Sequence, residues 1–216
     1  MNSATFESSQ PYTRGMSKDA SLDHPIHDLL ARRWSPYAFS GRPIPREDLL
    51  SIFEAARWAA SSFNEQPWRY LVASRDRQED FERVLSCLLE GNRTWAREAP
   101  TLALGCVRTT FSRNGRPNRV AQHDLGLASA SLTFEATSRG VYVHQMAGIL
   151  PDRAREACGI PEDFEAVTAL AMGYWADPDN AADLLQARDR NPRTRHPLSA
   201  FVFGAEWDVP GLGPDV

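Results

Sequence analysis

Cysteine is scarce in this chain. The three cysteines, Cys87, Cys106 and Cys158, are odd in number and widely spaced, and no pair has the spacing of a zinc finger. This usage does not indicate a disulfide framework and fits reduced thiols in a cytoplasm best. No stretch approaches the ~18 apolar residues of a membrane span, and the N-terminus lacks the basic-then-apolar order of a signal peptide. We therefore expect a cytoplasmic protein that does not contact membranes.

An excess of charge and several common site signatures are also missing. The 24 basic and 28 acidic residues leave a formal net charge of −4, which argues against a nucleic acid as partner. The glycine patterns of dinucleotide-binding folds and P-loops are absent, and so is a glycine-flanked serine elbow. His24 and His27 are better explained as surface residues than as a metal pair, and Cys106 as an inert buried thiol. The sequence predicts no metal site and no hydrolase nucleophile.

Length and composition favour one main domain. A chain of 216 residues with 42% hydrophobic and 10% aromatic residues can bury a core without disulfides. Residues 1–21 show no periodicity, and we expect them to form a poorly ordered N-terminal arm. Residues 22–204 are expected to form the domain, and residues 205–216 a C-terminal tail.

Helical and extended patterns alternate along the chain. Apolar residues at helical spacing predict helices over residues 23–32, 45–61, 81–89, 119–138 and 151–158. Gly91 and Gly159 are expected to end the third and the last of them. Apolar runs predict strands over residues 68–74, 101–107, 141–145 and 166–174. This order predicts an α+β (α/β-like) fold in which helices surround a mixed central sheet.

Three polar segments stand at special places in this pattern. They are Arg33-Trp34-Ser35 before the first long helix, Ser61-Ser62-Phe63-Asn64-Glu65-Gln66-Pro67-Trp68 after it, and Arg193-Thr194-Arg195 near the C-terminus. Taken singly, each is explained as cations at a helix C-terminus or as a polar turn. Together they suit a ligand with a phosphate, a polyol and a flat heteroaromatic ring, because arginines clamp phosphate and small polar groups bond hydroxyls and ring edges. Flavin mononucleotide (FMN) fits that description.

Two long stretches carry a resemblance to a known family. Residues 30–74, LARRWSPYAFSGRPIPREDLLSIFEAARWAASSFNEQPWRYLVAS, resemble the opening of the nitroreductase family of FMN-dependent oxidoreductases. Residues 140–178 resemble its second flavin segment, and RTRHPLSAFV resembles its phosphate-binding close. The resemblance covers most of residues 28–203 and implies the nitroreductase-type fold, with FMN sites at a homodimer interface.

The resemblance implies a phosphate clamp made from both ends of the chain. Arg33 and Ser35 would approach the FMN phosphate and one side of the ring. Trp34 would contribute backbone or stacking contact. Arg193 and Arg195 would complete the clamp.

Further positions match the family's contacts to the flavin ring. Ser61, Ser62 and Asn64 match positions that reach FMN bound largely by the other subunit, which makes the homodimer part of the active site. Asn92 matches an asparagine near the pyrimidine edge. A further match is the segment Met146–Gly148, which corresponds to the family's turn against the flavin N5 edge. Small residues and backbone N–H groups in such a turn can meet a ring nitrogen without crowding it.

The chain departs from the family pattern at three positions. Tyr37, also expected at the cofactor, stands where members commonly have Lys or Arg. Ala147 stands where some have an acid, and Ala60 where proline is usual. The departure at Tyr37 leaves open which cation, if any, stabilises reduced flavin at its N1 and C2 oxygen edge.

The resemblance implies an NAD(P)H oxidoreductase with a ping-pong mechanism. NAD(P)H would pass hydride to flavin N5, and an electron-poor acceptor such as a nitroaromatic, quinone or enone would then take its place. No side chain is expected to act as a catalytic acid or base, because the chemistry takes place on the flavin. Alternatives within the family are dehalogenation, semialdehyde reduction and flavin fragmentation. Two alternatives involve no catalysis: a flavin-binding protein, and a partner-binding domain with an eroded flavin site.

Overall fold

The computed structural model describes residues 18–176 and 183–212. Residues 1–17 of the expected N-terminal arm and residues 213–216 of the expected tail lie outside this described part. The described elements follow one another in the order α1 (Asp28–Arg32), α2 (Arg46–Arg57), η1 (Ser62–Asn64), β1 (Trp68–Ser74), α3 (Gln78–Leu85), α4 (Glu90–Ala96), β2 (Thr101–Arg108), α5 (Ala121–Ser138), β3 (Tyr142–Met146), α6 (Pro151–Cys158), β4 (Phe164–Gly173), α7 (Asp183–Arg190) and η3 (Leu198–Ala200).

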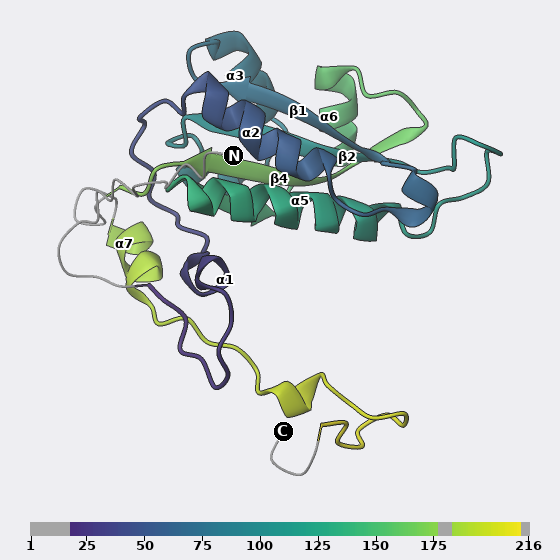
Figure 1. The fold of residues 1–216 in the computed structure, drawn as a ribbon. Helices are drawn as coiled ribbons and strands as arrows, with labels where there is room; N and C mark the ends of the chain where they lie inside the picture. Colours follow the sequence, from purple (N-terminus) through teal and green to yellow (C-terminus); the bar gives the residue numbers. More distant parts are fainter. Residues whose placement is uncertain (1–17, 177–182, 213–216) are drawn as a thin grey trace, which may run out of the picture.

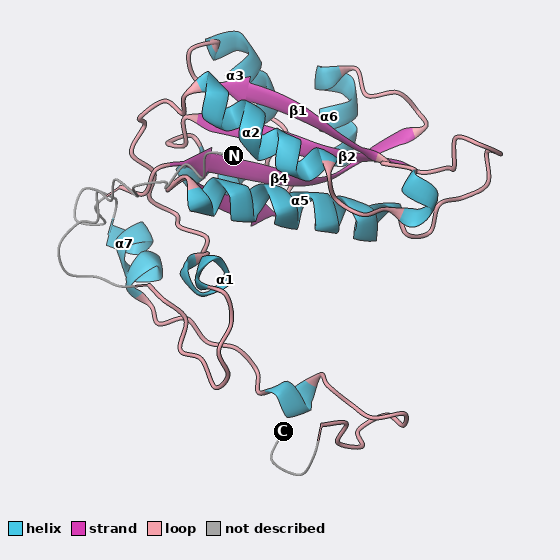
Figure 2. Ribbon diagram, viewed as in Figure 1, coloured by secondary structure: helices cyan, strands magenta, loops and turns pink. Residues whose placement is uncertain are grey.

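The centre of the fold is a four-stranded sheet with the strand order β1-β2-β4-β3 (Figure 2). The predicted α+β fold with a central sheet is confirmed. The pairings among these described strands are all antiparallel, so the expected mixed character does not arise within them. An apolar run has the same appearance in a parallel and in an antiparallel strand, and this is why the pattern could not decide the direction.

Helices cover both faces of the sheet (Figure 1). One apolar cluster joins α2 and α5 to one face, and another joins α3, α4 and α6 to the opposite face. Strand β2 is buried along nearly its whole length because its residues alternate between the two clusters, Leu102 and Leu104 on one side and Ala103 and Val107 on the other. This strand is the shared centre of both layers.

The segment between α3 and β2 differs from the expectation. The helix predicted over residues 81–89 ends at Leu85, and the predicted stop, Gly91, lies inside α4. The backbone leaves the helix because Leu88 forms a bridge with Ile149, while the Leu89 N–H donates to the Gly148 carbonyl at 3.0 Å. Pairing with a distant segment therefore overrides the helical periodicity at this place. Gly159, by contrast, ends α6 as expected, with a left-handed φ of 64°.

Part of the chain lies beside the layered body rather than on it. Helices α1 and α7 pack near one end of the body, and the C-terminal segment continues away from it (Figure 1). This segment exposes large apolar side chains, with 82% of Trp207 accessible to solvent. No described helix combines the length and the apolar character that a bilayer crossing requires.

Candidate functional site

Three guanidinium groups from opposite ends of the chain come together beside α1. Burial and the positive charges of Arg193 and Arg195 lower the pKa of Arg33, in that order of importance. The Arg33 Nη1 group also lies 3.4 Å from Ser35 Oγ, to which it donates a hydrogen bond. The cluster therefore concentrates like charge at a half-buried place, which favours an anion as its occupant.

Arg193 also ties the N-terminal segment to the C-terminal segment. Its Nη1 group donates to the carbonyls of Lys18 and Ala31, both at 2.6 Å, and its Nη2 group donates to the Arg33 carbonyl at 2.8 Å. Two of these acceptors lie at the end of α1, where helix carbonyls lack partners within the helix. Arg193 thus positions the backbone on which Arg33 stands. Arg195, in contrast, donates to the neighbouring Thr194 carbonyl and is exposed.

A buried carboxylate fixes the backbone that follows Ser35. Asp189 of α7 is only 1% exposed, and it accepts hydrogen bonds from the N–H groups of Tyr37 at 2.8 Å and Ala38 at 3.0 Å. Its Oδ2 atom also lies 3.4 Å from the indole nitrogen of Trp175, which donates to it. Because the sequence around Asp189 has the appearance of a charged surface helix, no signal in it predicted this role.

The ring of Trp34 packs among other aromatic rings. The ring is 7% exposed and packs edge-on against Tyr142 and Trp175, with centroid distances of 5.8 and 5.4 Å. Its side chain therefore belongs to the packing between the N-terminal segment and the sheet. The contact expected between Trp34 and FMN stays a prediction.

Tyr37 lies in an aromatic group with Trp95 and His144. Its ring centroid is 5.0 Å from Trp95 and 4.7 Å from His144, and the Arg188 guanidinium lies 5.0 Å from its centroid. The His144 Nδ1–H donates to the Pro36 carbonyl at 2.8 Å. Burial lowers the pKa of His144 despite this hydrogen bond, so the imidazole is held in its neutral form. His144 and Arg188 are further residues that the sequence did not reveal.

Asn92 contacts the turn after β3, and the contacts expected of both with FMN stay predictions. The Asn92 side-chain amide donates to the Gly148 carbonyl at 3.0 Å. A Cβ atom at Gly148 would lie 2.5 Å from the Asn92 amide nitrogen, so the close approach depends on glycine at this position. Met146 is buried and its carbonyl accepts from Thr168, while Ala147 is exposed. The turn thus presents its backbone and two small residues rather than long side chains.

The Ser61–Gln66 segment is a strained turn. Phe63, Asn64 and Gln66 have positive φ values of 53°, 54° and 50°, which non-glycine residues rarely adopt. The Ser61 hydroxyl accepts from the Gln66 N–H at 3.0 Å, and the Ser62 N–H donates to the buried Asp124 carboxylate at 3.1 Å. Strain of this kind gathers at functional sites, where the surroundings hold it in place.

The loop over residues 109–119 packs against this turn. The ring of Phe63 is 72% exposed and meets Phe111 edge-on at 5.9 Å, with the Arg113 guanidinium 4.0 Å from the Phe63 centroid. The Ser112 N–H donates to the Glu65 carboxylate at 2.7 Å. An exposed aromatic ring is thereby presented beside Ser61, Ser62 and Asn64.

The two sets of predicted cofactor residues lie apart within one chain. The turn containing η1 is beside the first turn of α5, as the bond between Ser62 and Asp124 shows. Helices α1 and α7, which carry or flank the arginine cluster, lie toward the other end of α5 (Figure 1). One polypeptide therefore does not bring Ser61, Ser62 and Asn64 to Arg33.

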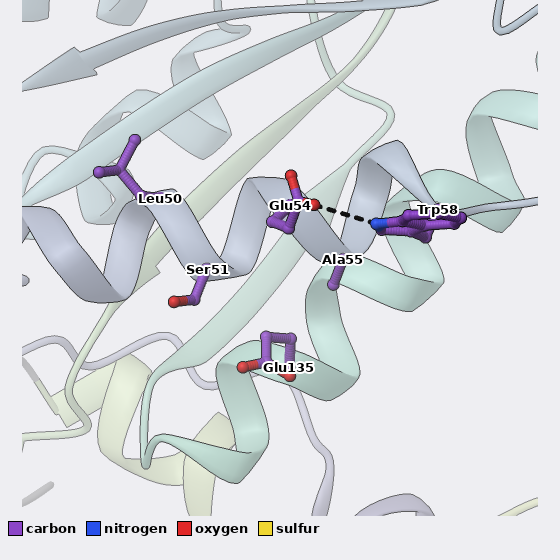
Figure 3. A pocket seen from close by; sticks show the side chains of 6 residues that line it. All are labelled: Leu50, Ser51, Glu54, Ala55, Trp58 and Glu135. Carbon is purple, nitrogen blue, oxygen red and sulfur yellow. Dashed lines mark hydrogen bonds between the residues drawn. The ribbon is translucent and has the colours of Figure 1, made fainter.

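A shallow groove of about 550 Å³ lies elsewhere, between α2 and α5 (Figure 3). Its lining comprises Leu50, Ser51, Glu54, Ala55, Trp58 and Glu135. The Trp58 indole N–H donates to Glu54 at 3.0 Å. The groove contains none of the predicted cofactor residues, and its two carboxylates would repel a phosphate. We therefore place the candidate site at the arginine cluster and the Gly148 turn.

Comparisons with known proteins identify the family of this chain. Residues 30–174 match the pattern of the Nitroreductase family. An uncharacterised 15.4 kDa protein of Mycolicibacterium smegmatis is 33% identical over 149 residues, which cover 66% of this chain and 99% of that protein. A stretch of 56 residues is 41% identical to the major NAD(P)H-flavin oxidoreductase of Aliivibrio fischeri and covers 26% of each protein.

Solved structures extend the similarity to the fold. The crystal structure of an oxidoreductase containing FMN has a TM-score of 0.83 and 36% sequence identity, and the match covers 89% of this chain and 98% of that one. A nitroreductase family protein from Clostridium difficile 630 has a TM-score of 0.65 at 22% identity and shows the same fold over 82% of this chain and 96% of that one. The chain belongs to the nitroreductase family.

Proposed function

We propose that this protein is an FMN-dependent oxidoreductase that uses NAD(P)H as electron donor. The observation that carries the proposal is the gathering of Arg33, Arg193 and Arg195, whose mutual repulsion an anionic phosphate would relieve. The FMN named for one similar structure and the NAD(P)H named for one similar protein support it.

The residues at the candidate site have the chemistry that binding of FMN requires. Arg33, Ser35 and Arg195 would hold the phosphate, and Arg193 would hold the backbone of Arg33 in place. The turn at Gly148 has no side chain to crowd a flat ring. FMN bound here would accept a hydride from NAD(P)H and pass it to an electron-poor acceptor such as a nitroaromatic, quinone or enone.

We assign Arg188 as the cation that the family commonly supplies at the position of Tyr37. Its guanidinium lies over the Tyr37 ring and so occupies the same neighbourhood from a different element, α7. Arg188→Leu is expected to lower the flavin reduction potential and slow reduction by NADPH, with Arg190→Leu as the control. An unchanged potential in Arg188→Leu would remove this assignment.

The homodimer is the second part of the proposal. Because Ser61, Ser62 and Asn64 lie away from the arginine cluster of their own chain, they would reach the FMN held by a second copy. Exposed apolar side chains on α1, on α5 and in the C-terminal segment provide a surface for that copy to cover, including Leu30, Leu127, Phe201 and Trp207.

Flavin binding is tested directly on the purified chain. We expect a yellow protein whose flavin absorbance is bleached anaerobically by NADH or NADPH without any acceptor, as a ping-pong mechanism requires. Initial rates at several acceptor concentrations should then give parallel double-reciprocal lines. Protein that lacks flavin absorbance and fails to bind added FMN would refute the cofactor assignment. Flavin that binds but is not bleached would identify a non-catalytic flavin-binding protein.

The shared site is tested by mixing two inactive variants. Arg33→Ala removes a residue of one half-site and Asn64→Ala a residue of the other, so each homodimer contains only damaged sites. A heterodimer of the two would contain one intact site, and random mixing would restore about a quarter of the wild-type sites. Absence of any recovery in a mixture shown by mass to contain heterodimers would place both half-sites in one chain.

A further inference from the structure

Two phenyl rings and one guanidinium meet at the end of the layered body that carries η1 (Figure 1). Phe63, Phe111 and Arg113 form this group, which we call the ring cluster. The Arg113 guanidinium carbon lies 4.0 Å from the centroid of Phe63 and 5.6 Å from that of Phe111, and the two rings are nearly perpendicular, at 83°. Phe63 and Arg113 are exposed and Phe111 is half-buried, so a ring and a cation face solvent side by side.

Arg113 lies in a hydrogen-bonded turn within residues 109–119. The Phe111 N–H donates to the Arg116 carbonyl at 2.8 Å, and the Gly115 N–H donates to the Phe111 carbonyl at 2.9 Å. Glycine allows the left-handed φ of 66° at Gly115 that this turn requires. Because these bonds form within the chain alone, little backbone entropy would remain to be lost when a ligand binds at the turn.

The backbone at Phe63 is held in place as well. The Ser62 N–H donates to Asp124 at 3.1 Å, and the Asn64 N–H donates to the Ser61 carbonyl at 3.0 Å. Between them Phe63 has a φ of 53° and leaves 72% of its surface exposed. Strained backbone and an exposed phenyl ring both cost free energy in an isolated chain, so their combination points to a partner for the ring outside this chain.

The ring cluster carries a positive charge that no acidic side chain balances. Residues 109–119 contain three arginines and no aspartate or glutamate. The Glu65 carboxylate contacts this segment, but it accepts from the Ser112 N–H. Among the residues that the structure describes, no carboxylate forms an ion pair with Arg113. Its planar guanidinium can therefore receive an incoming carboxylate through two parallel hydrogen bonds.

We propose that the ring cluster selects the electron acceptor, and that the acceptor it prefers is a flat aromatic ring with a carboxylate bonded directly to it. The acceptor ring would pack on Phe63, and its carboxylate would meet Arg113. The proposal rests on the proposed function, under which Ser62 and Asn64, the two neighbours of Phe63, reach the flavin held by a second copy. The Phe63 ring would then lie beside the flavin on which the acceptor is reduced.

The short separation within the ring cluster favours an aromatic carboxylate over the 2′-phosphate of NADPH. In an aromatic acid the anion is bonded to the ring itself, which matches a guanidinium 4.0 Å from a ring centroid. In NADPH a ribose separates the adenine ring from the 2′-phosphate. A phosphate at Arg113 is therefore an outcome that would contradict the proposal.

Titration calorimetry with ligands that cannot be reduced tests the ring cluster directly. The full-length protein as purified, with its flavin content measured by absorbance, is titrated with benzoate and with its neutral counterpart benzamide. We expect wild type to bind benzoate about tenfold more tightly than Arg113→Gln does, while both bind benzamide equally. Arg116→Gln, a change in the same exposed turn, is the matched control and should bind both ligands as wild type does. Phe63→Leu should weaken the binding of both, because both lose a stacking partner.

Reduction of the corresponding nitro compounds gives a second readout. NAD(P)H and one proton convert a nitro group to a nitroso group, and NAD(P)⁺ and one water are released. The ratio of kcat/KM for 4-nitrobenzoate to that for 4-nitrobenzamide should fall about tenfold in Arg113→Gln and keep its wild-type value in Arg116→Gln. A loss of general activity would lower both kcat/KM values alike and would not change this ratio.

Three results would overturn the proposal. They are equal affinity of wild type for benzoate and benzamide, equal losses of benzoate affinity in Arg113→Gln and Arg116→Gln, and a loss of affinity for NADPH relative to NADH in Arg113→Gln with benzoate binding unchanged. Any of them, in a yellow protein that NAD(P)H bleaches, would leave the proposed function intact. Absence of flavin absorbance and of FMN binding would instead refute the proposed function, and the assignment of the acceptor with it.

Discussion

The arginine cluster and the Ser61–Gln66 turn are held in different ways. Around the cluster, Asp189 reaches Tyr37 across 152 positions of the chain, and Arg193 reaches Arg33 across 160. In the turn, the Ser61 hydroxyl accepts a hydrogen bond from the N–H of Gln66, only five positions later. The Gln66 side chain in turn donates to the carbonyl of Asn64, two positions earlier. One half-site is thus assembled by the whole fold, whereas the other combines these local bonds with single bonds to Asp124 and Ser112.

This difference has an energetic consequence. Long-range hydrogen bonds form only after the loops between their partners have closed, and once buried they are costly to break because the remaining groups are left unpaired. A local turn closes cheaply but stores strain at its left-handed residues. We therefore expect mutations in the cluster to destabilise the protein and mutations that relax the turn to stabilise it.

The largest effect is expected from Asp189→Ala. The change leaves the N–H groups of Tyr37 and Ala38 without an acceptor, and the free energy of unfolding should fall by about 2–6 kcal/mol, at ~1–3 kcal/mol for each of the two unpaired groups. Urea denaturation at neutral pH measures this loss. Asp76→Ala, at an exposed turn, is the control and should stay within about 0.5 kcal/mol of wild type. Equal stability of Asp189→Ala and Asp76→Ala would contradict the expectation that long-range hydrogen bonds stabilise the arginine cluster.

Variants of Arg193 and Arg195 distinguish a residue that positions the backbone from one that binds the phosphate. Arg193→Ala should lower the free energy of unfolding by about 1–3 kcal/mol, because three carbonyls lose their donor, and should also weaken FMN binding. Arg193→Lys should not restore stability, because one ammonium cannot reproduce the planar fork. Arg195→Ala should weaken FMN binding with stability unchanged. Thermal or urea unfolding with FMN titration measures both quantities, and equal stability losses in the two alanine variants would contradict the assignment.

His144 predicts a pH dependence on the side of the cluster. Burial lowers the pKa of His144 in the folded state, so the unfolded chain binds a proton more readily. The stability from neutral His144 is fully present above its ordinary pKa near 6.5 and is lost progressively as the pH falls below that value. Unfolding midpoints at pH 7.5 and 5.5 should differ less in His144→Gln than in wild type. His24→Gln, at an exposed site, should show the wild-type difference.

The smallest effect is expected in the turn, with the opposite sign. Gln66→Gly removes a left-handed strain of about 1–2 kcal/mol at the cost of about 0.5–1 kcal/mol in backbone entropy and of the exposed hydrogen bond from Gln66 to Asn64, so stability should rise by at most about 0.5 kcal/mol. Glu65→Gly, at a neighbouring residue with a φ of −65°, should destabilise instead. Urea denaturation of the two variants decides the sign. Destabilisation by both would show that the turn is held by more than its local contacts.

Local signals account for the parts of the fold that were predicted well. Strand β1 has the predicted bounds, and α6 has its proline at the start and its left-handed glycine at the end. The prediction over residues 81–89 was wrong at its end because Leu88 and Leu89 pair with Ile149 and Gly148, 61 and 59 positions away, and hydrophobic periodicity carries no information on such pairing. The expected site residues came from the resemblance, and their contacts with FMN stay predictions.

By itself, the sequence determined the alternation of helices and strands, the capped ends of α6 and the residue types suited to a phosphate and a flat ring. These depend on hydrophobic periodicity and on groups a few positions apart, and the order of residues encodes both. Only the tertiary structure decided that Asp189 and Arg193 support the backbone around Arg33 and that Gly148 meets Asn92. Such contacts join residues between 56 and 160 positions apart, and they exist only after the sheet and its helical layers have formed.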